Sequence, residues 1–178
     1  MSAQEHEEAA ARHHRDAPIK LMLVTVSDSR TPETDQGGDR LQALALGAGH
    51  LIQIRQLVPD DPDLIRKSIA LGVDDPSIQA ILLTGGTGIS PRDGTVEVVR
   101  SMIAVELEGY GERLRAISVE SIGIAGLLSR ACAGVIRRTD GSGVLIFSMP
   151  GSVNAVETAT SELVLPLIKH AAWEVGRP

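Results

Sequence analysis

Residues 81–95 read ILLTGGTGISPRDGT, an apolar run that leads directly into a glycine-rich loop. Because glycine has no Cβ, a glycine-rich backbone can bring its N–H groups close to an anion. Threonine hydroxyls add donors, an arginine can bind an anion through two hydrogen bonds, and an aspartate can hold a metal ion. We therefore predict a site for a nucleotide or another phosphorylated ligand. Its candidate residues are Thr84, Gly85, Gly86, Thr87, Gly88, Arg92 and Asp93.

The loop differs from the two best-known phosphate-binding motifs. A P-loop needs a Lys-Ser/Thr pair after its last glycine, whereas Gly88 is followed by Ile89 and Ser90. The dinucleotide motif G-x-G-x-x-G fails because Pro91 occupies its third glycine position. A plain turn between a strand and a helix is the alternative, but the adjacent Arg92 and Asp93 favour a binding site.

The composition indicates one α/β domain. A chain of 178 residues can bury a substantial core. Apolar residues make up 43% of it but aromatic residues only 2%, so the core must consist mainly of Ile, Val, Leu and Ala. Such a core suits parallel strands covered by helices.

Charge and cysteine content exclude several classes of function. The net charge of −6 argues against nucleic acid as a partner. The single cysteine, Cys132, cannot form an intramolecular disulfide, and we expect it to be a packed side chain rather than a nucleophile.

No apolar run reaches the roughly 18 residues of a membrane span. Glu5, Glu7 and Glu8 lie where an export signal would be basic and then apolar, so we expect a cytoplasmic protein without membrane contact.

Apolar periodicity predicts alternating strands and helices. Residues 1–17 are polar and alanine-rich and are expected to form a flexible tail, with a single domain over 18–178. The last helix begins at Val153 and ends near Trp173, with a kink expected at Pro166. The other predicted elements are strands at 19–26, 51–58, 78–84 and 144–149, and helices at 41–48, 64–71, 96–103, 107–114 and 116–132. This order predicts a three-layer αβα sandwich around a mostly parallel sheet.

Four polar loops follow the four predicted strands: 27–31, 59–61, 84–93 and 148–152. In such folds ligands bind outside the carboxyl ends of the strands, so we expect these loops to form one crevice. This adds Asp28, Asp60, Ser148, Pro150, Gly151 and Ser152 to the candidate residues.

Several of these residues also have simpler interpretations. Asp60 or Asp61 can cap the following helix, and Asp28 can cap a turn. Arg92 can clamp a phosphate or form an ion pair with one of the carboxylates.

Three motifs together resemble the MoaB/Mog family of molybdenum cofactor biosynthesis. They are TGGTG-x-x-PRD-x-T at 84–95, MPG-x-x-NAV at 149–156 and VSDSRT at 26–31. Residues 128–131, Leu-Ser-Arg-Ala, are similar to a further segment of that family. The resemblance covers roughly residues 19–172. The glycine motif alone also occurs in related pterin-binding domains, but the motifs in this order are more specific.

The resemblance implies an α/β domain that binds molybdopterin, with ATP as a co-substrate and Mg²⁺ as the cofactor. Mog-type members transfer AMP from Mg-ATP to the molybdopterin phosphate. The resemblance assigns catalytic and metal-binding roles to Asp93 and Asp60, and a place in the pterin crevice to Asp28. It also implies a homotrimer or hexamer and contact with the molybdenum insertase. A non-catalytic molybdopterin-binding or carrier module is the alternative. A general nucleotide hydrolase is disfavoured because only Asp93 could activate water beside the loop.

Overall fold

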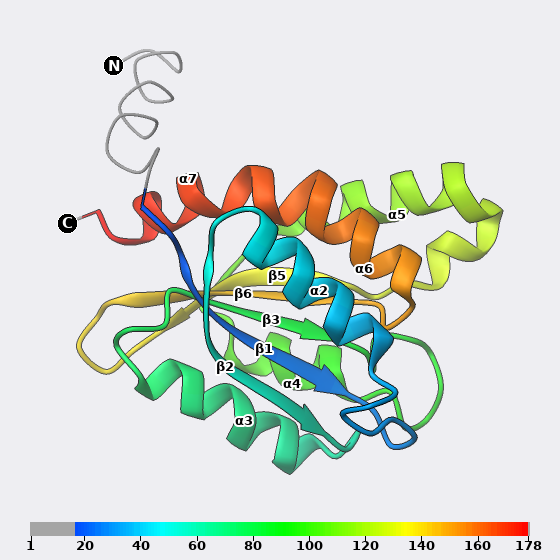
Figure 1. Cartoon of the computed structure of the whole chain (residues 1–178), viewed down its shortest axis with the longest axis horizontal. Helices are drawn as coiled ribbons and strands as arrows, with labels where there is room; N and C mark the ends of the chain where they lie inside the picture. Colours follow the sequence, from blue (N-terminus) through cyan, green and yellow to red (C-terminus); the bar gives the residue numbers. More distant parts are fainter. Residues whose placement is uncertain (1–16, 178) are drawn as a thin grey trace.

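The computed structural model describes residues 17–177, and its centre is a six-stranded sheet in the order β2-β1-β3-β6-β5-β4 (Figure 1). β1 pairs in parallel with β2 and β3, and β3 pairs in parallel with β6. β5 and β4 extend the sheet in antiparallel pairing. The strands are β1 (Lys20–Val26), β2 (Leu51–Val58), β3 (Ala80–Thr84), β4 (Val105–Glu106), β5 (Cys132–Arg137) and β6 (Gly143–Met149).

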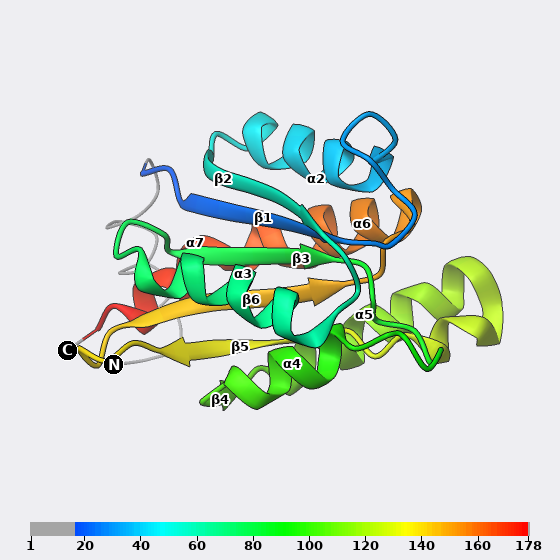
Figure 2. The same ribbon diagram turned by 90° about the horizontal axis from the view of Figure 1, so that it is seen from below.

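Helices cover both faces of this sheet. α2, α5, α6 and α7 lie on one face, and α3 and α4 lie on the other (Figures 1 and 2). Their bounds are α2 (Gln36–Gly47), α3 (Pro62–Asp74), α4 (Thr95–Met102), α5 (Glu108–Ile122), α6 (Val153–Ala159) and α7 (Leu165–Val175). A 3₁₀ turn, η1 (Gly123–Leu128), follows α5, and a π-helical turn, η2 (Thr160–Val164), joins α6 to α7. The predicted three-layer αβα sandwich with a mostly parallel sheet is confirmed.

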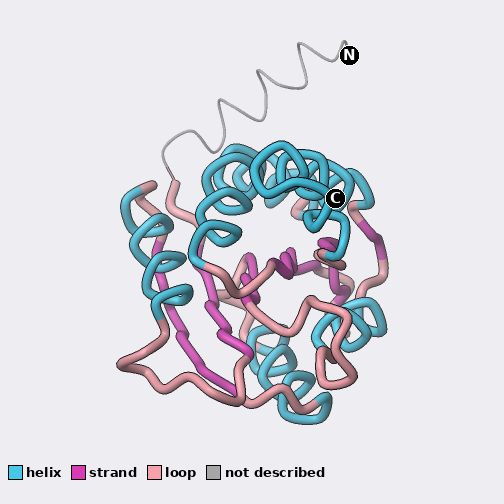
Figure 3. Tube along the Cα trace, turned by 90° about the vertical axis from the view of Figure 1, so that its right-hand side faces the viewer, coloured by secondary structure: helices cyan, strands magenta, loops and turns pink. Residues whose placement is uncertain are grey.

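The four predicted strands are the four parallel ones, and they end at the same edge of the sheet. Thr84 lies level with Thr25 of β1 on one side and with Met149 of β6 on the other. The loops after these strands therefore start side by side. Figure 3 looks onto this carboxyl edge, where loops gather between the helices.

Two strands, β4 and β5, were not predicted from the sequence, and both pair antiparallel. Residues 116–132 were predicted to be helical, but the helix ends at Ile122, the 3₁₀ turn ends at Leu128, and β5 begins at Cys132. β5 contains Ala and Gly, which are poor strand formers in isolation. A Cβ on its Gly134 would collide with the Val105 carbonyl, so the glycine lets β4 approach closely.

The last helix is interrupted one turn before Pro166. The Leu165 N–H donates to the carbonyl of Thr160, five residues earlier, which widens the helix there. Proline lacks an N–H and its ring crowds the preceding turn, so a π-helical turn accommodates it. The disturbance predicted at Pro166 is thus present, but it takes the form of a π segment over 160–164.

Two apolar clusters fill the space between the sheet and its helices. On the α2–α5–α6–α7 face, Phe147 is fully buried and meets Tyr110 edge-on, with ring centroids 5.4 Å apart. On the α3–α4 face the cluster is aliphatic, as the composition predicted. Cys132 is buried there, and burial raises the pKa of its thiol to about 11, so it packs as a small side chain.

The flexible tail predicted at 1–17 lies outside the described residues except for its last position. No helix within 17–177 combines the length and the apolar character that crossing a membrane would require.

Replacing Phe147 with alanine should lower the free energy of unfolding by about 3–5 kcal/mol, because it opens a cavity beside Tyr110 in the centre of the sheet. Urea unfolding followed by circular dichroism measures this change. Val105→Ala, at a side chain that is 49% exposed, is the control and should change stability by less than about 0.5 kcal/mol. Equal effects of the two substitutions would contradict the assignment of the core.

Candidate functional site

The four predicted loops meet in one open pocket of about 570 Å³ at the carboxyl edge of the sheet. Its walls come from the ends of β1, β2, β3 and β6 and from α5 and η1. The candidate residues that line it are Asp28, Asp60, Gly85, Gly86, Thr87, Gly88, Arg92, Asp93, Pro150, Gly151 and Ser152.

Two candidate residues do not line the pocket. Thr84 and Ser148 are fully buried within the sheet, so the prediction that they face the crevice was wrong. Both still belong to strands, where alternate side chains point into a helix-covered layer. The Thr84 hydroxyl donates to the Pro150 carbonyl at 3.1 Å and so ties the glycine loop to the β6 loop. The Ser148 hydroxyl has no partner among the described residues.

The glycine loop has a conformation that side chains would prevent. Gly85 and Gly86 have φ values of 104° and 62°, in the left-handed region that favours glycine. A Cβ on Gly85 would overlap the Val26 carbonyl, and one on Gly86 would overlap the Thr95 hydroxyl. The glycines therefore allow the loop to pack tightly against β1 and the start of α4.

The N–H groups of this loop are available to a ligand. No hydrogen bond among the described residues occupies the N–H of Gly86, Thr87, Gly88 or Ile89. Three of these four residues line the pocket. Consecutive unpaired backbone donors form a concave binding site for an anion.

Asp60 points into the site because its neighbour caps the helix. Asp61 accepts hydrogen bonds from the N–H groups of Asp63 and Leu64, both at 3.0 Å, and so caps α3. Asp60 instead lines the pocket, where its carboxylate accepts a hydrogen bond from the Gly94 N–H at 3.2 Å. The helix-capping interpretation thus applies to Asp61.

The carboxylates of Asp28, Asp60 and Asp93 line the same pocket. The Asp60 N–H donates to the Asp28 carboxylate at 3.1 Å. Burial raises the pKa of Asp60 above its ordinary value, and the negative charges of Asp93 and Asp28 act in the same direction. The Gly94 N–H and the Arg92 guanidinium lower it, but not enough to offset these effects. Crowded carboxylates of this kind favour a cation.

Asp93 and Arg92 each have a partner in the structure. The Asp93 carboxylate accepts a hydrogen bond from the Ser90 N–H at 2.7 Å, so it shapes the loop as well as lining the pocket. Arg92 forms an ion pair with Asp28 at 2.9 Å, which is the second interpretation of this arginine given above. Its side chain is 73% exposed, so solvent screens the pair.

The pocket has the donors that Mg²⁺ uses in phosphate-binding proteins. Mg²⁺ is usually held by one or two carboxylates and completes its shell with water and phosphate oxygens. Asp60 and Asp93 supply two carboxylates beside unpaired N–H groups, and the pKa of Asp60 is raised first by burial and then by the negative charges of Asp93 and Asp28. No group of three or more His, Cys, Asp or Glu side chains within 17–177 is arranged to hold a metal by itself. The residues fit a metal that arrives with a phosphorylated ligand.

Arg30 was missed as a supporting residue, although it lies in the VSDSRT motif. Its guanidinium donates to the Gly151 carbonyl at 2.9 Å and pairs with Asp35 at 3.4 Å. It therefore connects the loop after β1 to the loop after β6 across one wall of the pocket.

Asp35 anchors that wall from a nearly buried position. Its carboxylate accepts from the Thr25 hydroxyl at 2.6 Å, the Gly38 N–H at 2.9 Å and the Arg55 guanidinium at 3.1 Å. Burial alone would raise the pKa of Asp35, but these hydrogen bonds outweigh burial and the pKa lies below its ordinary value.

Arg130 was also missed as a supporting residue, and it binds the glycine loop from outside the main pocket. Its guanidinium donates to the carbonyls of Gly88 and Asp93, both at 2.7 Å, and pairs with Glu97. Its place in the Leu-Ser-Arg-Ala segment was the available signal.

The third missed feature is an apolar wall. Ile122, Ala125 and Leu128, from the end of α5 and from η1, line the pocket together with the polar loops. Figure 2 shows this part of the chain extending beyond the edge of the sheet. The sequence predicted only a helix over 116–132 here, so no pattern placed these residues at the site.

Fold and pocket together define a class: an α/β protein with a pocket suited to an anionic small ligand at the carboxyl edge of its parallel strands. Comparison with protein families makes this specific, since residues 22–170 match the model described as "Probable molybdopterin binding domain". The chain therefore belongs to the molybdopterin-binding domain family, within the MoaB/Mog group of molybdenum cofactor biosynthesis proteins.

Several named proteins are similar to this chain over most of its length. The chain is 39% identical over 180 residues to the molybdenum cofactor biosynthesis protein B of Bacillus subtilis, covering 99% of both chains. It is 36% identical to the protein of the same name from Escherichia coli K12, covering 84% of this chain and 85% of that one. A crystal structure of tungsten cofactor synthesizing protein MoaB from Pyrococcus furiosus superposes with a TM-score of 0.80 at 32% identity, covering 90% and 98%.

Acidification should test the Asp35 anchor. Because the pKa of Asp35 is lowered in the folded protein, its stabilisation is complete above the ordinary value of 3.8 and is lost as the pH falls through the folded pKa. Asp35→Asn should cost about 1–3 kcal/mol at pH 7. The difference from wild type should shrink below pH 3.8, measured by urea unfolding at several pH values. A difference that does not change with pH would contradict this role.

Asp39→Asn, at a 59% exposed partner of Arg55, is the control and should cost less than about 1 kcal/mol.

Proposed function

We propose that this protein binds molybdopterin and adenylylates its phosphate with Mg-ATP. The observation that carries the proposal is the row of unpaired N–H groups at Gly86–Ile89, which lies beside the Asp60 and Asp93 carboxylates. Membership of the molybdopterin-binding family supports molybdopterin as the ligand.

The reaction requires several negative groups to come together. An oxygen of the molybdopterin phosphate attacks the α-phosphorus of ATP, the bond from that phosphorus to the bridging oxygen breaks, and pyrophosphate leaves. Negative charge on the transferring group is best stabilised by fixed donors that are already in place. The N–H groups of Gly86, Thr87 and Gly88 are such donors. Asp60 and Asp93 would hold Mg²⁺, which neutralises phosphate charge when bound.

The apolar wall suits the ring systems of these substrates. A pocket of about 570 Å³ falls in the range of small-molecule sites. Ile122, Ala125 and Leu128 offer aliphatic surface to a flat heterocycle, while the polar loops of the same pocket offer charged and hydrogen-bonding groups to its phosphates.

The Arg92–Asp28 ion pair favours a second candidate function, a non-catalytic molybdopterin-binding or carrier module. In that pair the exposed arginine of the loop is bound to a carboxylate of the pocket rather than held ready for a phosphate. Incubating the protein with Mg-ATP and molybdopterin separates the two candidates. Release of pyrophosphate supports adenylylation, whereas molybdopterin binding without release supports the carrier.

We further propose a cytoplasmic homotrimer or hexamer that contacts the molybdenum insertase. Sedimentation equilibrium should then give three or six times the chain mass of 18.8 kDa. A monomer would contradict the proposed assembly.

Asp93→Asn should reduce adenylyl transfer by roughly 100-fold or more while changing molybdopterin affinity by less than about threefold. Asparagine keeps an oxygen that can accept the Ser90 N–H, so the loop should keep its shape while its charge toward Mg²⁺ is lost. Pyrophosphate release and equilibrium binding of molybdopterin measure the two effects.

The control is Asp74→Asn, which removes the same charge from an exposed position at the end of α3. It should leave both quantities unchanged. An equal loss of transfer and of binding in Asp93→Asn would contradict a catalytic role for Asp93.

A further inference from the structure

We propose that Arg130 is a positioning residue that turns the backbone N–H groups of the glycine loop toward the ligand. This inference rests on the proposed function, because it assigns those N–H groups to a phosphorylated ligand. The inference goes beyond family membership, because it makes the affinity for the ligand depend on a side chain that does not contact the ligand.

Arg130 holds three carbonyl groups of one loop. Its Nε donates to the Gly88 carbonyl and its Nη2 to the Asp93 carbonyl, both at 2.7 Å. Its own backbone N–H donates to the Thr87 carbonyl at 3.1 Å. Both ends of the segment 88–93 are thus bound to a single residue.

Because the peptide group is planar, hydrogen bonds to these carbonyl groups also fix the direction of the adjacent N–H groups. In a planar trans peptide the C=O of one residue and the N–H of the next point to opposite sides. The Asp93–Gly94 peptide demonstrates this, because its carbonyl faces Arg130 while its N–H donates to Asp60, which lines the pocket. By the same geometry, the carbonyls of Thr87 and Gly88 facing Arg130 direct the N–H groups of Gly88 and Ile89 away from it.

Arg130 acts from the far side of the loop. It does not line the main pocket but a separate hollow of about 540 Å³, which it shares with Glu97 and Arg66. Glu97, on the first turns of α4, forms an ion pair with the guanidinium and holds it in place. Gly88 lines the main pocket, whereas Ile89 lines the second hollow, so a ligand in the main pocket would meet the Gly88 N–H that Arg130 orients, and not Arg130 itself.

An arginine is needed for this arrangement. Its guanidinium carries five N–H donors in a rigid planar fork, so it can bond two carbonyls and a carboxylate together. A lysine ammonium keeps the charge but cannot reproduce the fork. We therefore expect lysine to restore only part of the effect.

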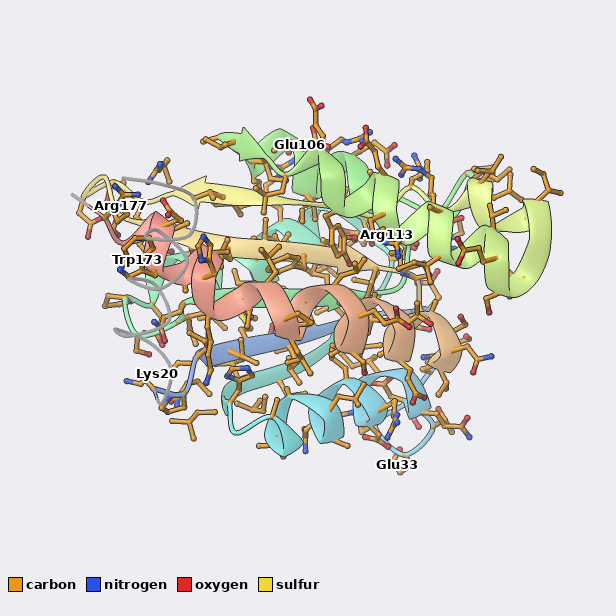
Figure 4. The ribbon with its side chains drawn as sticks, turned by 90° about the horizontal axis from the view of Figure 1, so that it is seen from above. Lys20, Glu33, Glu106, Arg113, Trp173 and Arg177 are labelled. Atoms are coloured by element: carbon orange, nitrogen blue, oxygen red, sulfur yellow. The ribbon has the colours of Figure 1, made fainter. Side chains whose placement is uncertain are left out.

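The test compares wild type with Arg130→Gln, Arg130→Lys and a control, Arg113→Gln. Arg113 is exposed on α5 and forms no hydrogen bond or ion pair with any other residue of 17–177, and removing it changes the net charge equally (Figure 4). Isothermal titration with Mg-ATP measures affinity. Amide hydrogen exchange by NMR measures whether the Gly94 N–H still reaches Asp60.

Arg130→Gln should weaken Mg-ATP binding by roughly tenfold and accelerate exchange at Gly94 by a similar factor, because the hydrogen bonds of a charged group are lost. The amide resonances of Gly88 and Ile89 should shift, whereas exchange in the core strand at Phe147 should not change. Arg130→Lys should fall between wild type and Arg130→Gln, and Arg113→Gln should match wild type.

Unchanged affinity and unchanged Gly94 exchange in Arg130→Gln would overturn the inference, as would equally faster exchange at Phe147 or equal losses in Arg113→Gln. If Arg130→Gln does not fold, Arg130→Lys carries the same comparison. If wild type itself binds no Mg-ATP, the proposed function fails. In that case the Gly94 exchange and the Gly88 and Ile89 resonances alone support or overturn the role of Arg130.

Discussion

Parallel alignment of β2, β1, β3 and β6 is the constraint on which the pocket depends. Because Thr25, Thr84 and Met149 lie level across three adjacent strands, the following loops leave the sheet side by side. Backbone hydrogen bonds fix that register, and the buried apolar side chains on both faces resist a slip by one residue. The polar residues thus gather at one edge even though they are distant in the sequence.

Side chains then fix these loops by binding their carbonyl groups. Thr84 bonds the Pro150 carbonyl, Arg30 bonds the Gly151 carbonyl, and Arg130 bonds those of Gly88 and Asp93. A loop whose carbonyls are held from outside presents its N–H groups in a fixed direction and needs little reorganisation when an anion binds. The two arginines are themselves held by carboxylates, Arg30 by Asp35 and Arg130 by Glu97.

The sequence predicted the parallel strands and the loops because their signals are local. The strand at 78–84 contains the apolar run 80–83, and a loop rich in glycine follows it directly. The antiparallel strand at Cys132 was missed because its alanine and glycine gain their strand conformation only from pairing with β6. Thr84 and Ser148 were misplaced because a polar residue at a strand end gives no sign of which way its side chain points. Arg30 and Arg130 act through contacts 121 and 37–42 residues away, which no local pattern contains.

The charges of the side chains that line the pocket favour an anionic ligand that binds together with a cation. Arg30 is bound to Asp35 and Arg92 to Asp28, so both arginines of the pocket are largely compensated. Asp60 and Asp93 have no ion-pair partner among residues 17–177, and their mutual repulsion contributes to the raised pKa of Asp60. A phosphate entering alone would bring more negative charge against these two carboxylates. Under the proposed function, a divalent cation bound to the phosphate would reverse that repulsion, because the carboxylates would supply ligands to the metal while the Gly86–Gly88 N–H groups would bind the phosphate oxygens. The same two aspartates would thus disfavour a bare anion and favour one that carries Mg²⁺.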